Sequence, residues 1–300
     1  MKAARFSSFG GPEVLEIVEL ADPQPGPGQV RIAVRAAGVN AGDWKKRQGL
    51  MDRELPQTLG HEAAGVVDRL GDGVSDVAVG DRVFGLSGEG AAQAESAVLD
   101  HYVPMPPALD FATAAALPAA LETAARSLDQ LGVAAGSTLL VNGASGSIGG
   151  AAVQLAVARG ARVIGTAGPA NHDHLRSLGA EPVAYGEGMA ARVRTLAPGG
   201  VDLALDVAGS GVLPELIALA GAPANVVTIA DFAGAREHGV RFSRGDTGRA
   251  LYVLTEIGPL IEAGRFVPPT VRTFPLADIA EAHRVGEAGG LRGKLVLLVD

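Results

Sequence analysis

The sequence predicts an α/β protein in which a small β-barrel domain precedes a doubly wound parallel sheet. Three observations support this prediction. Residues 1–115 contain short apolar segments, one of period two, separated by Gly, Pro and Asp turns. Residues 116–258 alternate between strand-like and helix-like apolar segments. Residues 137–168 form the unit around which the chain is organised: a strand, a glycine turn, a helix and a second strand.

The first predicted domain, residues 1–115, is rich in strands. Residues 30–36 alternate in period two, as a half-buried strand does. Further strands are predicted at 64–70, which ends in a Gly-Asp-Gly turn, and at 79–84. Short strands separated by close turns are typical of a small barrel.

The second predicted domain, residues 116–258, begins within an alanine-rich helix at 112–131. Beyond the glycine turn, helices and strands alternate as in a doubly wound sheet. They are predicted at 173–178 (helix), 182–185 (strand), 189–196 (helix), 201–207 (strand), 212–219 (helix) and 225–230 (strand). Residues 236–247, rich in charge and glycine, are a candidate substrate loop.

The end of the chain, residues 259–300, returns to strands. A helix at 251–263 precedes strands at 270–274 and 295–299, which flank a helix at 277–287. We therefore expect this part of the chain to rejoin the first domain.

The glycine turn has the properties of a phosphate-binding site. Residues 138–141 form an apolar strand, and Gly143, Gly146 and Gly149 follow in a G-x-x-G-x-x-G pattern before a helix. Glycine lets the backbone bend sharply and approach a ligand closely. The free N–H groups and positive dipole end of the helix suit a pyrophosphate. The turn therefore predicts a dinucleotide site; the alternative is a tight strand–helix turn without a ligand.

The residues after the second strand of this unit favour NADP over NAD. An acidic residue there would bind the ribose 2′-hydroxyl of NAD, but residues 165–172 contain no carboxylate. They contain no Arg or Lys to hold a 2′-phosphate either. The weaker hydrogen-bonding groups available in their place are Thr166, Asn171, His172 and Tyr185.

Composition excludes several classes of function. The net charge of −8 and an aromatic content of 4% argue against nucleic-acid or anionic-membrane partners. The chain has no cysteine, which excludes disulfides, thiol catalysis and cysteine-ligated zinc. It has no apolar signal segment at its N-terminus and no run of 18 apolar residues, so we expect a soluble cytoplasmic protein.

Six motifs spread along nearly the whole chain carry a family resemblance. They lie at residues 38–45, 59–67, 79–83, 115–118 with 122–124, 143–149, and 274–276 with 281–284 and 293–294. Together they resemble the zinc-free quinone oxidoreductase branch of the medium-chain dehydrogenase/reductase superfamily. The resemblance implies a GroES-like domain, a Rossmann domain and a C-terminal return to the first. It also implies NADPH-dependent reduction of a quinone or an α,β-unsaturated carbonyl, a small-molecule substrate in a cleft between the domains, and a homodimer.

The resemblance implies three catalytic residues. Asn40 would be an amide donor near the nicotinamide ribose or the substrate, and the hydroxyl of Thr123 would face the nicotinamide. Lys45 stands where many relatives have a tyrosine; it would donate a proton or stabilise an enolate, or else be a solvated surface charge. Asp43 is expected to order its own loop.

The implied cofactor-binding residues lie mainly in the Rossmann part of the chain. Besides Asn40 and Thr123, they are Gly143, Ser145, Gly146, Ser147, Ile148, Gly149, Thr166, His172, Tyr185, Ile229 and Lys294. Packing at a strand edge is the alternative for Tyr185.

No metal site is predicted. Zinc members of the superfamily have a cysteine where this chain has Asn40, and His61 with Glu62 falls short of the three protein ligands of a catalytic zinc. Two rival readings remain open: a low-turnover NADP-binding sensor or structural homologue of the same fold, and a zinc alcohol dehydrogenase.

Overall fold

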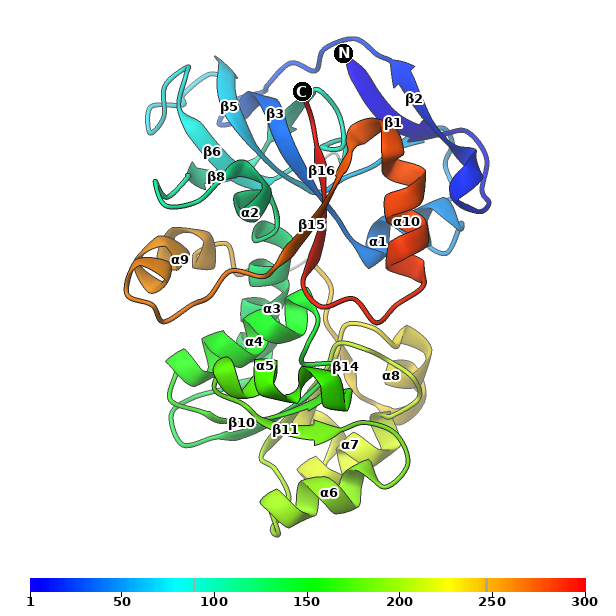
Figure 1. The fold of residues 1–300 in the computed structure, drawn as a ribbon, viewed down its shortest axis with the longest axis vertical. Coiled ribbons are helices and arrows are strands. Elements are labelled where there is room, and N and C mark those ends of the chain that lie inside the picture. The colour runs from blue at the N-terminus through cyan, green and yellow to red at the C-terminus, as the bar shows by residue number, and fades with distance from the viewer. Residues whose placement is uncertain (89, 246–247) are drawn as a thin grey trace. The chain divides into compact units, whose positions relative to one another are not determined.

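The computed structural model describes residues 1–88, 90–245 and 248–300 (Figure 1). The chain divides into two compact units. Unit 1 consists of residues 1–119 and 268–300, and unit 2 of residues 120–267. The boundaries predicted from the sequence, near residues 115 and 258, stay predictions.

Unit 1 is built on a seven-stranded sheet with the order β15-β16-β3-β5-β6-β8, and β7 also pairs with β3. A smaller sheet has the order β2-β1-β4. The strands are β1 (Lys2–Phe6), β2 (Leu15–Glu19), β3 (Val30–Val39), β4 (Gln57–Thr58), β5 (Glu62–Leu70), β6 (Arg82–Leu86), β7 (Ser96–Leu99), β8 (His101–Pro104), β15 (Val271–Pro275) and β16 (Lys294–Leu298).

Strand β3 lies in the middle of this sheet, and its apolar residues face the core. Val30, Ile32 and Val34 are buried, while the residues between them are half-buried, as the period-two pattern requires. The C-terminal strand β16 pairs antiparallel with β3, so the end of the chain joins the first sheet. In this register Leu295 lies opposite Val39, which brings Lys294 beside Asn40.

In the described residues of unit 1, three helices and two short 3₁₀-helices accompany the sheets: η1 (Pro12–Val14), α1 (Ala41–Arg47), α2 (Phe111–Ala115), η4 (Leu276–Asp278) and α10 (Ile279–Glu287). Helix α1 is joined to α10 through Arg47, whose side chain is fully buried. Its guanidinium donates to Glu287, to the Gly10 carbonyl and to His283 Nδ1, the last at 3.3 Å. Trp44 packs edge-on against the ring of His283, with 6.1 Å between centroids.

Unit 2 is a six-stranded parallel sheet with the order β11-β10-β9-β12-β13-β14. This is the doubly wound arrangement, and the predicted α/β class is confirmed. The elements between the unit boundaries are α3 (Pro118–Leu131), β9 (Thr138–Asn142), α4 (Ser147–Ala158), β10 (Arg162–Ala167), η2 (Pro169–Asn171), α5 (His172–Ser177), β11 (Glu181–Ala184), α6 (Met189–Leu196), β12 (Leu203–Asp206), α7 (Leu213–Ala220), η3 (Pro223–Asn225), β13 (Val226–Thr228), α8 (Phe232–His238), β14 (Arg241–Phe242) and α9 (Val253–Glu262).

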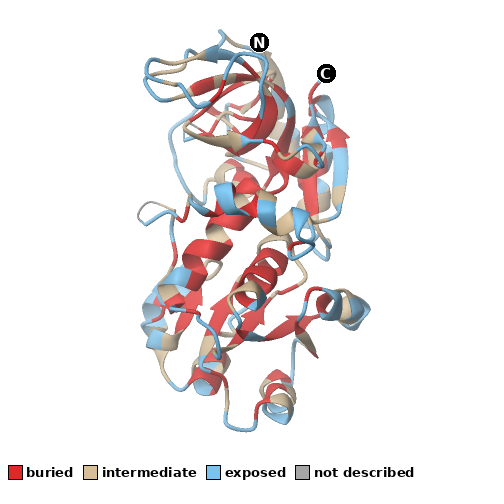
Figure 2. Ribbon diagram, turned by 90° about the vertical axis from the view of Figure 1, so that its left-hand side faces the viewer, coloured by how far each residue is buried: buried red, intermediate tan, exposed pale blue. Residues whose placement is uncertain are grey.

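The central strands of this sheet are apolar because helices cover them. Figure 2 shows the strands largely buried and the outer helical faces exposed. Leu140, Ile164 and Ala204 are fully buried, and helix α4 is buried along most of its length. Of the helices in the described residues, none is long and apolar enough to cross a membrane.

Three predicted elements differ from the observed ones. The helix predicted at 112–131 is two helices, because Pro118 disfavours a helical conformation at Leu117 and is itself well suited to begin α3. The strand predicted from residue 79 begins at Arg82, and Val79 is exposed in the turn before it. The loop predicted at 236–247 contains the end of α8 and all of β14, while Asp246 and Thr247 lie outside the described residues.

The buried His283 makes the stability of unit 1 depend on pH. Burial, with the nearby Arg47 charge, lowers the pKa of His283 from its ordinary 6.5 to about 3. Between these values the unfolded chain binds a proton that the folded chain does not, so stability falls as the pH is lowered from about 6.5 towards 3. The contribution is up to about 1.4 kcal/mol per pH unit.

Urea unfolding of wild type and His283→Gln, followed by circular dichroism at pH 7 and pH 4.5, tests this assignment. The free energy of unfolding should fall more in wild type than in the variant. Parallel losses would contradict the assignment.

Candidate functional site

The glycine turn between β9 and α4 leaves room for an anion. Gly143 has a φ of +84°, which favours glycine. A Cβ on Gly149 would lie 2.2 Å from the Gly143 carbonyl oxygen, so the start of α4 packs directly on the turn. Around Gly146, the N-cap residue of α4, an added Cβ would by contrast meet only one atom, at 3.8 Å. The turn therefore fits a pyrophosphate at the N-terminus of α4.

Thr166, at the end of β10, supports the turn from behind. Its side chain is fully buried, and its hydroxyl accepts from the Gly143 N–H at 3.0 Å and donates to Asn142 Oδ1 at 2.7 Å. Because the hydroxyl has one proton, that proton is committed to Asn142. Thr166 thus holds the turn in place, and its contact with the cofactor stays a prediction.

The same hydrogen-bond network continues across the carboxyl ends of the parallel strands to Asp206. This buried carboxylate accepts from Asn142 Nδ2 at 2.9 Å and from the Thr228 hydroxyl at 2.8 Å. It also accepts from the N–H groups of Ala208 and Gly209, so the charge is fully hydrogen-bonded. The Ile229 N–H donates to the Asp206 carbonyl at 3.0 Å, which fixes the strand end predicted to pass the nicotinamide.

The residues predicted to bind the adenosine part of the cofactor follow β10 and β11. Tyr185 follows β11 with 65% of its surface exposed, and the space around Gly168 is bordered by its ring. Arg192 donates to the carbonyl oxygens of Ala184 and Tyr185, which fixes the backbone there and adds a positive charge. His172, half-buried, lies with Nε2 3.3 Å from the Ala167 carbonyl oxygen.

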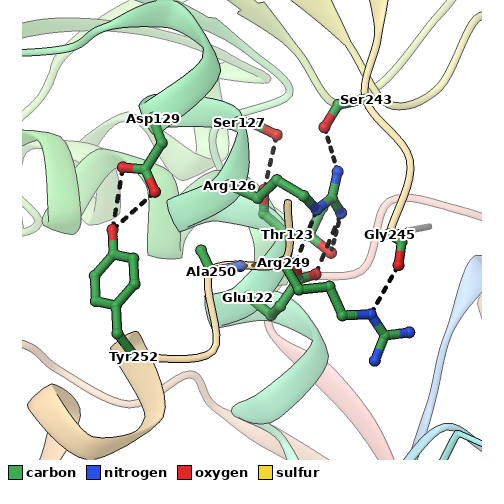
Figure 3. A network of polar contacts seen from close by, with 10 residues as sticks. All are labelled: Glu122, Thr123, Arg126, Ser127, Asp129, Ser243, Gly245, Arg249, Ala250 and Tyr252. Carbon is green, nitrogen blue, oxygen red and sulfur yellow. Dashed lines mark hydrogen bonds and ion pairs between the residues drawn. The ribbon is translucent and has the colours of Figure 1, made fainter. Parts of the chain in front are cut away.

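Thr123 lies on the second turn of α3, half-buried and next to a buried ion pair. Arg126 Nε donates to Glu122 Oε1 at 2.8 Å, and Arg126 Nη2 lies 3.5 Å from the Thr123 hydroxyl oxygen (Figure 3). Ser127 donates its hydroxyl to the Thr123 carbonyl at 2.7 Å.

In unit 1, Asn40 is held by a buried ion pair. Its amide Nδ2 donates to Glu62 Oε1 at 2.8 Å, and its Oδ1 accepts from Lys294 Nζ at 2.5 Å. Lys294 Nζ is also 2.6 Å from Glu62 Oε1, and neither side chain exposes more than 3% of its surface. The backbone N–H of Ala119 donates to the other carboxylate oxygen at 2.7 Å. Gly38 is required here, since an added Cβ would lie 2.2 Å from Glu62 Oε1.

Asp43 orders the turn after Asn40. Its fully buried carboxylate accepts from the N–H groups of Asn40 at 2.8 Å and Gly60 at 3.3 Å, and from Gln93 Nε2 at 3.1 Å. Burial raises the pKa of Asp43, and the neighbouring His61 opposes the increase. Lys45 is half-buried on α1 and makes no side-chain hydrogen bond or ion pair with the described residues.

The residues around Asn40 do not fit a zinc ion. The Glu62 carboxylate is engaged by the ammonium group of Lys294, and the position of the zinc members' cysteine holds an amide. Among the described residues, no group of three or more His, Asp or Glu side chains could hold a metal.

The predicted site residues fall into two groups, one in each unit. Asn40, Lys45 and Lys294 belong to unit 1, and the remaining residues belong to unit 2. Sequence reasoning missed the residues that hold these groups in place: Glu62 as a partner of Asn40, and Asn142, Asp206, Thr228 and Arg126. A polar residue at the end of an apolar strand segment was the signal for Asn142, Asp206 and Thr228.

Two known protein families match different parts of the chain. Residues 26–106 match the alcohol dehydrogenase GroES-like domain family, and residues 178–297 match the zinc-binding dehydrogenase family. The quinone oxidoreductase of Rattus norvegicus is 32% identical over 327 residues, covering 100% of this chain and 98% of the rat protein.

Two further relatives extend the comparison. A spectinabilin polyketide synthase system protein of Streptomyces orinoci is 38% identical over 98% of this chain, which spans only 14% of that protein. A mycobacterial protein solved in complex with NADPH has a TM-score of 0.87 and 29% identity, with 100% of both chains covered.

We expect Gly149→Ala to weaken binding of a nicotinamide dinucleotide at least about tenfold, because its Cβ would push α4 away from the turn. Titration followed by nicotinamide fluorescence measures the effect. Gly199→Ala is the matched control, since a Cβ there meets no atom within 4 Å. Equal affinity of Gly149→Ala and wild type would exclude the turn as the binding site.

Lys294→Met should destabilise unit 1 by about 3–5 kcal/mol, because it leaves the Glu62 carboxylate buried without its counter-ion. The double variant Glu62→Gln/Lys294→Met removes both charges and should lose less. Urea unfolding measures both, with Lys2→Met as an exposed control in the same unit. A larger loss in the double variant than in the single one would contradict this account.

Proposed function

Because this chain belongs to the quinone oxidoreductase branch of the medium-chain dehydrogenase/reductase superfamily, we propose that it is an NADPH-dependent, zinc-independent reductase of a quinone or an α,β-unsaturated carbonyl. A nicotinamide cofactor follows from the family. The observation that carries the proposal is the glycine turn at the start of α4, with its open space at Gly146 and its buried support from Thr166.

The preference for NADPH is supported by the carboxyl ends of β10 and β11. Residues 165–172 offer no carboxylate to a ribose 2′-hydroxyl. The Arg192 guanidinium, bound to backbone carbonyls, contributes a positive charge beside Tyr185, which favours a 2′-phosphate. The exposed Tyr185 ring offers an apolar face to the adenosine part of the cofactor, and a related mycobacterial protein binds NADPH.

The chemistry requires few proton-transfer groups. When bound, the nicotinamide supplies a hydride, and the protein orients the acceptor and stabilises the anion that develops on it. Asn40 has one amide proton left after its bond to Glu62, and this proton is available to a ribose or acceptor oxygen. Lys45, whose ammonium is not engaged by described residues, would deliver a proton to the enolate or hydroquinone oxygen.

Of the two acceptor classes, the quinone is supported by the name of a relative. The rat relative is a quinone oxidoreductase, whereas the Streptomyces relative belongs to a polyketide synthase system. The proposal includes a homodimer, as the family resemblance implies, and a cytoplasmic location. A low-turnover NADP-binding protein of the same fold is the second candidate, and it predicts cofactor binding without reduction of any acceptor.

Titration with NADPH and NADH, followed by an acceptor panel of quinones and enones, tests the proposal. We expect NADPH to bind at least about tenfold more tightly than NADH and to be oxidised by one of the two classes. His172→Asp should reduce this preference, because a carboxylate there repels the 2′-phosphate. Thr195→Asp, on the exposed side of α6, is the charge-matched control, because it also replaces a neutral side chain by a carboxylate. Binding of neither cofactor would overturn the proposal, and binding without turnover would favour the second candidate.

A further inference from the structure

A buried ion pair in α3 ties together three separate segments of unit 2. Glu122 and Arg126 are one helical turn apart and expose 7% and 4% of their side chains. The pair is bidentate, with Nε–Oε1 at 2.8 Å and Nη2–Oε2 at 3.2 Å (Figure 3). Bidentate geometry fixes the plane of the guanidinium and therefore the direction of its remaining N–H groups.

The remaining groups of the pair bind two residues outside α3, Ser243 and Ala250. Arg126 Nη1 donates to the Ser243 hydroxyl, directly after β14, and Glu122 Oε1 accepts from the Ala250 N–H at 3.3 Å. The Ser243 N–H in turn donates to the Thr228 carbonyl at 2.9 Å, next to the strand end that carries Ile229. One guanidinium thus links α3 to the carboxyl end of the sheet.

The same guanidinium sets the polarity of the Thr123 hydroxyl. Arg126 Nη2 lies 3.5 Å from Thr123 Oγ1. Arginine has only donors, so the hydroxyl oxygen can act towards it only as an acceptor. The hydroxyl proton is consequently directed away from Arg126, and Thr123 is left as a hydrogen-bond donor on the half-buried side of α3.

We infer that Arg126 is a positioning residue for hydride transfer: it holds Thr123 as a hydrogen-bond donor and, with Glu122, fixes Ser243 and Ala250. The inference builds on the proposed function, in which Thr123 faces the nicotinamide. A donor hydroxyl there would bind the carboxamide oxygen of the nicotinamide or the oxygen of the acceptor, and so restrict the ring to a productive orientation.

A bidentate pair in a buried position is a costly way to obtain stability alone. Apolar residues of similar volume often stabilise a core as well as or better than a buried ion pair. The pair at Glu122 and Arg126 offers what apolar residues cannot: directed N–H groups aimed at two hydroxyl oxygens.

The test is a double-mutant cycle of Arg126→Lys and Thr123→Val. Single-turnover oxidation of bound NADPH by 9,10-phenanthrenequinone measures the hydride-transfer rate. Lysine keeps the charge opposite Glu122 but loses the planar fork, and we expect the rate to fall about 10- to 100-fold in each single variant. If Arg126 acts through Thr123, the double variant is no more than about twofold slower than the slower single variant. Additive losses overturn the inference.

Binding of adenosine 2′,5′-bisphosphate separates positioning from folding. This ligand lacks the nicotinamide, so Arg126→Lys should bind it as wild type does. If Arg126→Lys loses this binding, Ser243→Ala replaces it as the test variant, because it leaves the ion pair intact. Ser243→Ala should slow hydride transfer several-fold. A wild-type rate in this variant overturns the inference.

Arg162→Lys is the matched control, because Arg162 also forms a bidentate pair, with Glu181, at the amino ends of β10 and β11. We expect it to transfer hydride at the wild-type rate. The proposed function is tested separately, by NADPH binding and quinone reduction in the wild-type protein. If wild type is active and Arg126→Lys is equally fast, the proposed function stands and only the role of Arg126 is excluded.

Discussion

Unit 2 depends on the hydrogen bonds that the buried carboxylate of Asp206 accepts. A charge at this position has to be fully hydrogen-bonded, and its partners come from β9, β13 and the turn after β12. Because Asn142 is one of them, the requirement extends through Thr166 to the glycine turn. The turn that suits a pyrophosphate and the strand end that would pass a nicotinamide are therefore held by one network of bonds.

Unit 1 also contains a buried, fully paired carboxylate, but here the partner is a positively charged side chain. Glu62 is as buried as Asp206, but a lysine from the last strand of the chain neutralises it. The amide of Asn40 donates to Glu62 and accepts from Lys294, which fixes both its position and its orientation. In both units the residues proposed to touch ligands are oriented by buried polar groups.

The sequence predicted the fold class and the glycine turn because these depend on local patterns. Period-two segments, alternating elements and glycine spacing are all visible within short windows. The partnership of Lys294 with Asn40 was not predictable from such patterns, because it follows from the register of β16 on β3, between residues 254 positions apart. Pro118 did carry a local signal, but the alanine-rich periodicity on either side concealed the break. Helix α8 was missed although Asp231 caps it, since a short helix beside a glycine-rich segment has little periodicity.

The placement of Trp44 has a practical consequence. It is the single tryptophan of the chain, and it lies in α1, packed against His283 and Gly286 of α10. Intrinsic fluorescence excited above the tyrosine band therefore reports on unit 1 alone. Unfolding of this unit can be followed separately from that of the whole chain without attaching a label.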